Sequence, residues 1–306
     1  MAFTAKDVAE LRRQTGCGMM DCKRALTEAD GNMEEAIKVL REKGMAATAK
    51  KASRIAAEGI VDILTVGDVT AMIEVNSETD FVAKNESFRA FVRSILETII
   101  ATRPATVDEL MGKTMADGQT VEAALQEKTF TIGEKLSLRR FVVVEGVVST
   151  YIHGGGVTGV IICFDADDAA VSNPGFAEFA KNIALQAAAL PSQYVDRASV
   201  PESVLAEEKD ILTKQMEQDP KFAGKPAKVL EGIINGKLGK FYENNCLTEQ
   251  PYVKDDSLTV GKYIAAAARE FGGAIKVTNF YRYDKGEGIQ KREDDFADEV
   301  SKMIQQ

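Results

Sequence analysis

The sequence of 306 residues contains few of the side chains on which covalent chemistry and metal binding depend. It has one histidine, four cysteines and no tryptophan. Cys17 and Cys22 have no further cysteine or histidine nearby in the sequence to complete a tetrahedral zinc site. Four cysteines are also too few for a disulfide scaffold, and a reducing compartment would keep them as thiols. The sequence therefore favours neither a metal site nor catalysis by a cysteine–histidine pair.

The chain also lacks long apolar runs and an excess of positive charge. No segment approaches the roughly 18 apolar residues of a membrane span, and the opening residues MAFTAKDVAELRRQ contain no apolar signal core. Lysine and arginine number 38 against 47 aspartate and glutamate residues, which gives a net charge of −9. Broad contact with DNA or RNA requires a basic face. We therefore expect a cytoplasmic protein that binds neither membranes nor nucleic acid directly.

Residues 1–44 are predicted to form a compact module of three helices. The spacing of apolar residues predicts a helix that is capped by Thr4, a second helix over Met19–Glu28, and a third that ends at Gly44. A module of about 45 residues has a small core and is expected to be only modestly stable. Residues 45–57 are small and basic, and we interpret them as a partly helical linker.

An internal repeat follows this linker and indicates two related α+β subdomains. Residues 58–95 and 145–183 each contain two β-rich runs around a glycine turn, then a polar loop and an amphipathic helix. The copies align with one residue inserted at the turn, so that Asp80 corresponds to Asp168. The stretch between them, residues 106–140, is predicted to hold short helices.

These patterns predict an α+β fold with core subdomains over 58–140 and 141–283. Two charged, helix-favouring segments in the second subdomain predict a helical hairpin inserted at about 197–247. The remaining predicted elements are a helix over Val260–Phe271, a strand over Ala274–Tyr283 and, within a C-terminal module over 284–306, an amphipathic helix with Phe296, Val300 and Met303 on one face.

Residues 154–159 match the G-x-G-x-x-G pattern of dinucleotide-binding proteins. In those proteins the motif joins a strand to a helix, and the helix N-terminus binds the pyrophosphate. Here the motif joins two β-rich runs, and its counterpart in the first copy is the plain turn Gly67-Asp68. We therefore interpret it as a hairpin turn and expect no nucleotide cofactor. A nucleotide-dependent enzyme built on this loop is the alternative.

The polar loop of the first copy, residues 77–85, is predicted to form a short helical turn ahead of the long helix. Ser77 and Asp80 have the spacing of a capping box, so the turn can begin there. In the second copy Asn173-Pro174 has the pattern of an N-cap and a first helical position. The corresponding position in the first copy places the start of its long helix near Asn85.

Apolar side chains at these turns are candidates for contact with a partner. The second copy has Ala169 where the first has Phe81, which suggests a role for Phe81 beyond the shared fold; the alternative is that Phe81 packs beneath its own helix. Met19 and Met20 follow a glycine-rich loop, and at most one of them can face a three-helix core. His153 is expected at a hairpin tip, as a contact or as a solvated turn residue.

The sequence closely resembles the family of bacterial translation elongation factor Ts along its whole length. The resemblance is carried by the segments Leu11–Lys23, Thr79–Asn85, His153–Gly154, Gly239–Tyr242, Leu247–Tyr252 and Gly286–Ile289. It implies that the N-terminal module is similar to a ubiquitin-associated domain. It also implies two related core subdomains, which the internal repeat indicates independently.

The resemblance implies a guanine-nucleotide exchange factor for the GTPase elongation factor Tu, and no enzyme. Such a protein binds the GDP form, displaces Mg²⁺ and promotes GDP release so that GTP can bind. Displacement of the partner's Mg²⁺ is implied for Thr79, Asp80, Phe81 and Val82. Contact with the partner is implied for Met19, Met20, Lys23, His153 and Gly154. The resemblance implies no catalytic residue, metal site or cofactor in this chain itself.

The oligomeric state and the function each have an alternative. Residues 190–245 correspond to a helical hairpin whose length varies in the family and through which some members dimerise, so a homodimer or a dimer of heterodimers is an expectation to test. A ubiquitin-associated-like adaptor without exchange activity, in which residues 1–44 carry the function, is the alternative to the exchange factor.

Overall fold

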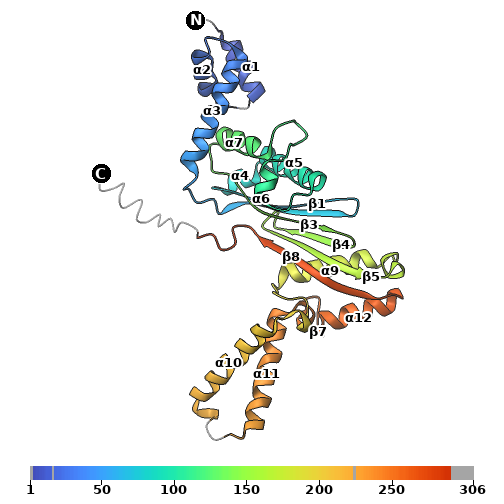
Figure 1. The fold of residues 1–306 in the computed structure, drawn as a ribbon. Coiled ribbons are helices and arrows are strands. Elements are labelled where there is room, and N and C mark those ends of the chain that lie inside the picture. The colour runs from blue at the N-terminus through green and yellow to red at the C-terminus, as the bar shows by residue number, and fades with distance from the viewer. Residues whose placement is uncertain (1–2, 16, 223–224, 291–306) are drawn as a thin grey trace. The chain divides into compact units, whose positions relative to one another are not determined.

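The computed structural model describes residues 3–15, 17–222 and 225–290, and Figure 1 shows a mixture of helices and small sheets. The predicted α+β class is confirmed. The described chain divides into two compact units, the first comprising residues 3–143, 154–157 and 283–290 and the second comprising residues 144–153 and 158–282. In the part of the chain that is described, no helix combines the length and the apolar character needed to cross a bilayer. The predicted helix with Phe296, Val300 and Met303 lies outside the described residues.

Three helices open the first unit: α1 (Ala5–Thr15), α2 (Met19–Glu28) and α3 (Met33–Lys51). α2 has the predicted bounds, but the prediction that Gly44 ends the third helix is wrong. A glycine in a helix interior costs only about 1 kcal/mol, and the residues after Gly44 are mostly good helix formers. The helix also packs against α7 (Val121–Ile132), where a Cβ added at Gly44 would lie 3.5 Å from the Cβ of Phe130.

The first repeat copy forms a β-hairpin that is covered by a helix (Figure 1). Its elements are β1 (Glu58–Val66), β2 (Val69–Ser77), α4 (Asp80–Lys84) and α5 (Glu86–Thr102). α5 packs on the hairpin through Phe88, Val92, Ile95, Leu96 and Ile99, which are all buried. After α6 (Val107–Met111) and α7, strand β3 (Ser137–Glu145) joins the sheet beside β2, in the order β1-β2-β3. The sequence pattern does not predict β3.

The second copy has the same order of elements, which confirms the predicted duplication. It forms β4 (Val148–His153), β5 (Thr158–Ala166), α8 (Asp168–Val171) and α9 (Phe176–Ala189). The short helix α8 begins at Asp168, as α4 begins at Asp80. The motif at 154–159 contains the turn between β4 and β5, where His153 pairs with Thr158. It joins two strands, so the interpretation as a hairpin turn is confirmed.

The rest of the second unit contains the predicted helical hairpin, α10 (Glu202–Gln218) and α11 (Ala227–Asn245), which lie side by side (Figure 1). A small hairpin that the pattern does not predict follows, β6 (Pro251–Tyr252) and β7 (Asp255–Thr259). α12 (Val260–Phe271) has its predicted bounds, and β8 (Ile275–Asp284) lies beside β5 in the order β4-β5-β8. Short 3₁₀ helices occur at Arg197–Ser199, Pro220–Phe222 and Leu247–Glu249.

The ends of the long helices test the predicted caps. Asn85 is the N-cap of α5, as predicted, because its side-chain oxygen accepts hydrogen bonds from the N–H groups of Ser87 (2.9 Å) and Phe88 (3.3 Å). The equivalent prediction for Asn173 is wrong, because α9 begins later, with Gly175 as its N-cap. There the side chain of Asn173 accepts from the N–H of Gly175 at 2.9 Å, as in a tight turn.

Replacing the confirmed cap is expected to lower the stability of the first unit. Asn85→Ala removes the acceptor for two N–H groups and should lower the free energy of unfolding by about 1 kcal/mol. Asn85→Asp keeps an acceptor at the helix N-terminus and serves as the matched control. Urea unfolding followed by circular dichroism measures both variants. Equal losses in the two variants would contradict the assignment of Asn85 as the cap.

Candidate partner-binding surface

The α4 turn, defined as residues 77–85, presents an apolar side chain to solvent. Phe81 on α4 is 81% exposed, so the interpretation that it packs beneath its own helix is wrong. Val82 and Ala83, the next residues of α4, pack into the core of the first unit instead. Ala169, the counterpart of Phe81 in the second copy, is exposed as well. Both copies thus turn this position towards solvent, and only the first copy has an aromatic residue there.

Hydrogen bonds from a distant loop hold the start of the α4 turn. Glu134, between α7 and β3, accepts from the N–H groups of Glu78 (3.1 Å) and Thr79 (3.0 Å) and from the Thr79 hydroxyl (2.6 Å). In return, the Glu78 carboxylate accepts from the N–H of Lys135 at 2.6 Å and forms an ion pair with Arg54 at 3.2 Å. Hydrogen bonds to ionised acceptors are stronger than neutral ones. The α4 turn and the loop after α7 therefore each supply a carboxylate that accepts hydrogen bonds from the other segment.

The cap of α4 differs from the predicted capping box. Thr79 is the N-cap, and its hydroxyl oxygen accepts from the N–H of Val82 at 3.5 Å, whereas the Ser77 hydroxyl donates to the carbonyl oxygen of Thr79 at 2.9 Å. Asp80 occupies the first helical position and pairs with Lys84 at 2.5 Å. The hydrogen bond from Lys84 lowers the pKa of Asp80, so this exposed side chain is a carboxylate at neutral pH.

Arg89 on α5 connects the end of α4 to the turn of the second hairpin. Its Nε donates to the carbonyl oxygen of Ala83 at 3.1 Å, and its guanidinium donates to the carbonyl oxygen of Gly155 at 2.5 Å. The N–H of Val61 in β1 donates to the carbonyl oxygen of Gly156 at 2.9 Å. All of these residues belong to the first unit. The turn at 154–157 is therefore fixed to the same unit as the α4 turn.

The other residues with implied partner contacts are exposed. Met19 and Met20 are 45% and 63% exposed, so neither faces the helical core. Lys23 follows one helical turn later on the same exposed face, which we call the α2 face. His153 ends β4 and Gly154 begins the turn with a φ of +58°. The opposite side of α2 supplies the core residues Cys22, Ala25 and Leu26.

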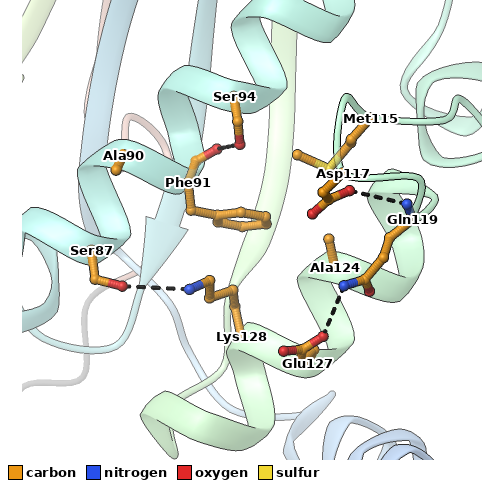
Figure 2. Close-up of a pocket in the computed structure, with 10 residues that line it drawn as sticks. All are labelled: Ser87, Ala90, Phe91, Ser94, Met115, Asp117, Gln119, Ala124, Glu127 and Lys128. Atoms are coloured by element: carbon orange, nitrogen blue, oxygen red, sulfur yellow. Dashed lines mark hydrogen bonds between the residues drawn. The ribbon is translucent and has the colours of Figure 1, made fainter. Parts of the chain in front are cut away.

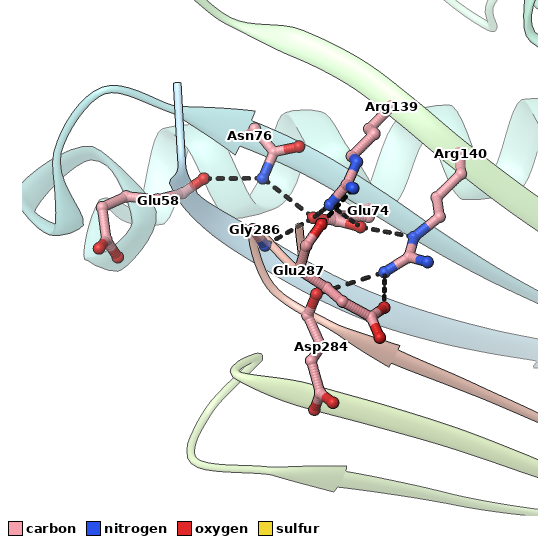
Figure 3. Close-up of polar contacts among 8 residues, drawn as sticks. All are labelled: Glu58, Glu74, Asn76, Arg139, Arg140, Asp284, Gly286 and Glu287. Atoms are coloured by element: carbon pink, nitrogen blue, oxygen red, sulfur yellow. Dashed lines mark hydrogen bonds and ion pairs between the residues drawn. The ribbon is translucent and has the colours of Figure 1, made fainter. Parts of the chain in front are cut away.

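A buried carboxylate organises the interior of the first unit (Figure 3). Glu74 in β2 is fully buried and forms ion pairs with Arg139 at 3.0 Å and Arg140 at 2.6 Å, both from β3. It also accepts hydrogen bonds from the N–H of Gly286 at 2.8 Å and from the side chain of Asn76 at 3.0 Å. Burial raises the pKa of Glu74, but these four donors outweigh burial and lower the pKa overall.

The chain segment that follows β8 is fastened beside this carboxylate. Gly286 has a φ of +68°, and a Cβ at this position would lie 2.2 Å from the carbonyl oxygen of Ala57, so only glycine fits. The N–H of Lys285 donates to the carbonyl oxygen of Val157 at 2.8 Å. The Glu287 carboxylate pairs with Arg140 at 3.0 Å. The segment around Gly286 is therefore an integral part of the first unit.

A pocket of about 350 Å³ opens between α5 and α7 in the first unit (Figure 2). Its polar side chains hydrogen-bond within its own wall. Lys128 donates to Ser87 at 3.4 Å, Gln119 donates to Glu127 at 3.2 Å, and Asp117 accepts from the N–H of Gln119 at 3.0 Å. A ligand would have to compete with these contacts. We therefore assign no ligand to this pocket.

The cysteines are protonated thiols at neutral pH. Burial raises the pKa of Cys17, Cys22 and Cys163, and raises that of Cys246 to about 11. A protonated thiol is a poor nucleophile and a poor metal ligand. Over the described ranges, no group of three or more histidine, cysteine, aspartate or glutamate side chains is arranged to hold a metal ion.

The structure is an α+β scaffold built from a duplicated unit of hairpin, short helix and long helix. A family model described as elongation factor TS matches residues 78–287. The chain is 46% identical over 308 residues to elongation factor Ts of Clostridioides difficile (strain 630). It is 43% identical over 307 residues to elongation factor Ts of Clostridium botulinum (strain Eklund 17B / Type B), and both alignments cover 99% of each chain. The chain belongs to the elongation factor Ts family, which supports a role as an elongation factor in protein biosynthesis.

The sequence pattern does not predict Glu134 or Arg89, although both contact the α4 turn. Glu134 follows Gly133, which ends α7 with a φ of +86°. A glycine in the left-handed conformation commonly ends a helix, so the sequence can indicate the end of α7. Nothing in the local sequence connects the next residue to Thr79, which lies 55 residues earlier. The packing of α7 in the core and the pairing of β3 with β2 bring the two segments together.

Proposed function

We propose that this chain is a guanine-nucleotide exchange factor for elongation factor Tu. It binds the GDP form of that GTPase, displaces Mg²⁺ and promotes GDP release so that GTP can bind. The observation that supports this most is Phe81, a large apolar side chain that is 81% exposed on a short helix with a firmly bonded start. An apolar group already held in place loses little conformational entropy when it enters a partner's surface.

The proposed mechanism needs binding and no covalent chemistry. Thr79, Asp80, Phe81 and Val82 contact the GTPase beside its metal and phosphate site, with Phe81 as an apolar wedge. A protein that prefers the nucleotide-free GTPase must weaken nucleotide binding by the same free energy. Loss of Mg²⁺ removes the largest local positive charge from the diphosphate, so GDP leaves faster.

Further contacts of the proposed complex dock the GTPase and do not act on its metal. They comprise the α2 face, with Met19, Met20 and Lys23, and the hairpin tip with His153 and Gly154. Their exposure is compatible with this role. The proposal includes a cytoplasmic location and no direct contact with nucleic acid or membranes.

The test is the release of a fluorescent GDP analogue from elongation factor Tu in the presence of excess unlabelled GDP. The release rate should rise with the concentration of this chain and then saturate. Excess Mg²⁺ should suppress the effect, because the metal and the exchange factor favour different states of the GTPase. A release rate that stays at its spontaneous value at every concentration of the chain rejects the proposed function.

Met20→Asp is expected to weaken association with elongation factor Tu by about tenfold or more, because an unpaired charge in an apolar contact costs at least about 1–3 kcal/mol. The N-terminal helices should stay folded, since Met20 is 63% exposed. Val66→Asp, at the exposed valine that ends β1, is the matched control. Calorimetric titration measures the affinity, and circular dichroism measures helix content. A loss of helix content in Met20→Asp would show that the contact interpretation is wrong.

A further inference from the structure

Glu134 stands out among the residues outside the proposed contact surface. Its two carboxylate oxygens accept three hydrogen bonds, and all three come from Glu78 and Thr79 at the start of the α4 turn. We propose that Glu134 is a positioning residue for nucleotide exchange, acting through Thr79 to fix the direction in which Phe81 projects. This inference rests on the proposed function and adds to it a residue that does not itself contact the GTPase.

The need for such a residue follows from the length of α4. The helix has five residues, Asp80–Lys84. Helices of this length are not stable alone, because nucleation fixes several residues for few hydrogen bonds. The orientation of α4 must therefore come from contacts outside it. At the C-terminal end Arg89 holds the carbonyl oxygen of Ala83, and at the N-terminal end Glu134 holds Thr79.

The Thr79 hydroxyl transmits the position of Glu134 to the helix. A hydroxyl has one hydrogen and two acceptor lone pairs. Because Thr79 donates its hydrogen to Glu134 at 2.6 Å, its lone pairs are free to accept from the N–H of Val82 at 3.5 Å. Without the Glu134 carboxylate, the Thr79 hydroxyl and the N–H groups of Glu78 and Thr79 all lose their hydrogen-bond acceptor. The first turn of α4, which includes Phe81, would then be held less tightly, because only Arg89 and the core contacts of Val82 and Ala83 would still orient the helix.

The contact is reciprocal, which separates it from an ordinary surface hydrogen bond. The carboxylate of Glu78 accepts from the N–H of Lys135, next to Glu134, at 2.6 Å. The Lys135 side chain donates in turn to the carbonyl oxygens of Ala52 (2.7 Å) and Arg54 (2.9 Å). The loop after α7 is thus tied to the segment before β1 as well as to the α4 turn. It offers a fixed support against which α4 is oriented.

The test measures the same GDP release with the full-length variant Glu134→Ala. We expect the release rate at saturating concentration to fall by about tenfold, on the scale set by the loss of hydrogen bonds to a charged acceptor. Glu134→Gln keeps one carbonyl oxygen that can accept from the two N–H groups, and it should give an intermediate rate. Glu109→Ala is the matched control, because Glu109 accepts from the N–H of Ala105 beside α6, another five-residue helix. With Glu109→Ala, GDP should leave elongation factor Tu at the same rate as with the wild-type chain.

A double variant separates positioning from a general loss of stability. If Glu134 acts through Phe81, then Phe81→Ala combined with Glu134→Ala should be no slower than Phe81→Ala alone. Hydrogen exchange should also quicken at the N–H groups of Thr79 and Val82 in Glu134→Ala. If this variant unfolds below the assay temperature, Glu134→Gln takes its place in the double variant.

Two results would overturn the inference while leaving the proposed function standing. One is a wild-type release rate in folded Glu134→Ala. The other is a double variant in which the two losses multiply, because independent effects would mean that Glu134 does not act through Phe81. A wild-type chain that never accelerates GDP release is a different result, and it rejects the proposed function itself.

Discussion

Phe81→Ala is expected to slow GDP release from elongation factor Tu by at least about tenfold, while the free energy of unfolding changes by no more than about 0.5 kcal/mol. The side chain is 81% exposed, so its removal leaves no cavity in the core. The second copy of the repeat already carries alanine, Ala169, at this position. The variant should still bind the GTPase, because the α2 face and the hairpin tip are unchanged. The maximal rate should therefore fall more than the affinity.

Phe88→Ala is the aromatic control for this experiment. Phe88 lies seven residues later on α5 and is fully buried in the core of the first unit. Its replacement should lower the free energy of unfolding by about 3–5 kcal/mol. Thermal unfolding beside the release assay distinguishes the two phenylalanines. The wedge proposal fails if folded Phe81→Ala promotes GDP release at the wild-type rate. Excess Mg²⁺ should remove most of the difference in release rate between this variant and the wild type.

Glu74→Leu is expected to lower the free energy of unfolding by about 3 kcal/mol or more, because removing the buried carboxylate leaves its donors without an acceptor. The guanidinium groups of Arg139 and Arg140 lose their shared carboxylate, and the N–H of Gly286 loses its acceptor. Urea unfolding measures the effect. Glu122→Leu, at an exposed position on α7, is the control and should change the stability by no more than about 0.5 kcal/mol. Similar losses in both variants would contradict the role assigned to the cluster.

The same carboxylate makes the stability of the first unit depend on pH. The folded pKa of Glu74 lies below its ordinary value of 4.5, so the unfolded chain takes up this proton first as the pH falls. The stabilisation by Glu74 is therefore complete above about pH 4.5 and is lost as the pH falls through the folded pKa. The difference in stability between wild type and Glu74→Leu should narrow over that range. A difference that stays constant down to pH 3 would contradict this assignment.

The local elements follow from the sequence wherever a local signal determines them. Met19–Glu28 and Val260–Phe271 are bounded by glycine loops or a capping threonine, and their predicted bounds agree with the structure. The duplicated order of elements is predictable because both copies retain their turns and apolar spacing. Gly44 shows the limit of such signals. Glycine ordinarily disfavours a helix, but α3 continues through Gly44, where it packs close to Phe130 of α7.

The contacts that arrange these elements could not be predicted, because their partners are distant in sequence. Glu74 is one of several acidic residues in strand-like segments, and nothing local marks it as buried. Its partners Arg139 and Gly286 lie 65 and 212 residues further along the chain. The α4 turn was located from the repeat, but the support from Glu134 depends on the pairing of β3 with β2. Long-range pairing of charges has no short-range signature.

The position of Gly286 has a consequence for the order in which the chain folds on the ribosome. Polypeptides emerge from the N-terminus, and domains generally begin to fold as they emerge. The chain leaves the first unit after Val143 and returns to it only at Tyr283, apart from the short turn at 154–157. Glu74 and its two arginines therefore emerge well before the N–H of Gly286 that completes their cluster. The first unit must therefore remain incomplete while the second unit is translated. A nascent chain stalled before residue 284 should be cut more readily by protease in β2 than a chain released after residue 290.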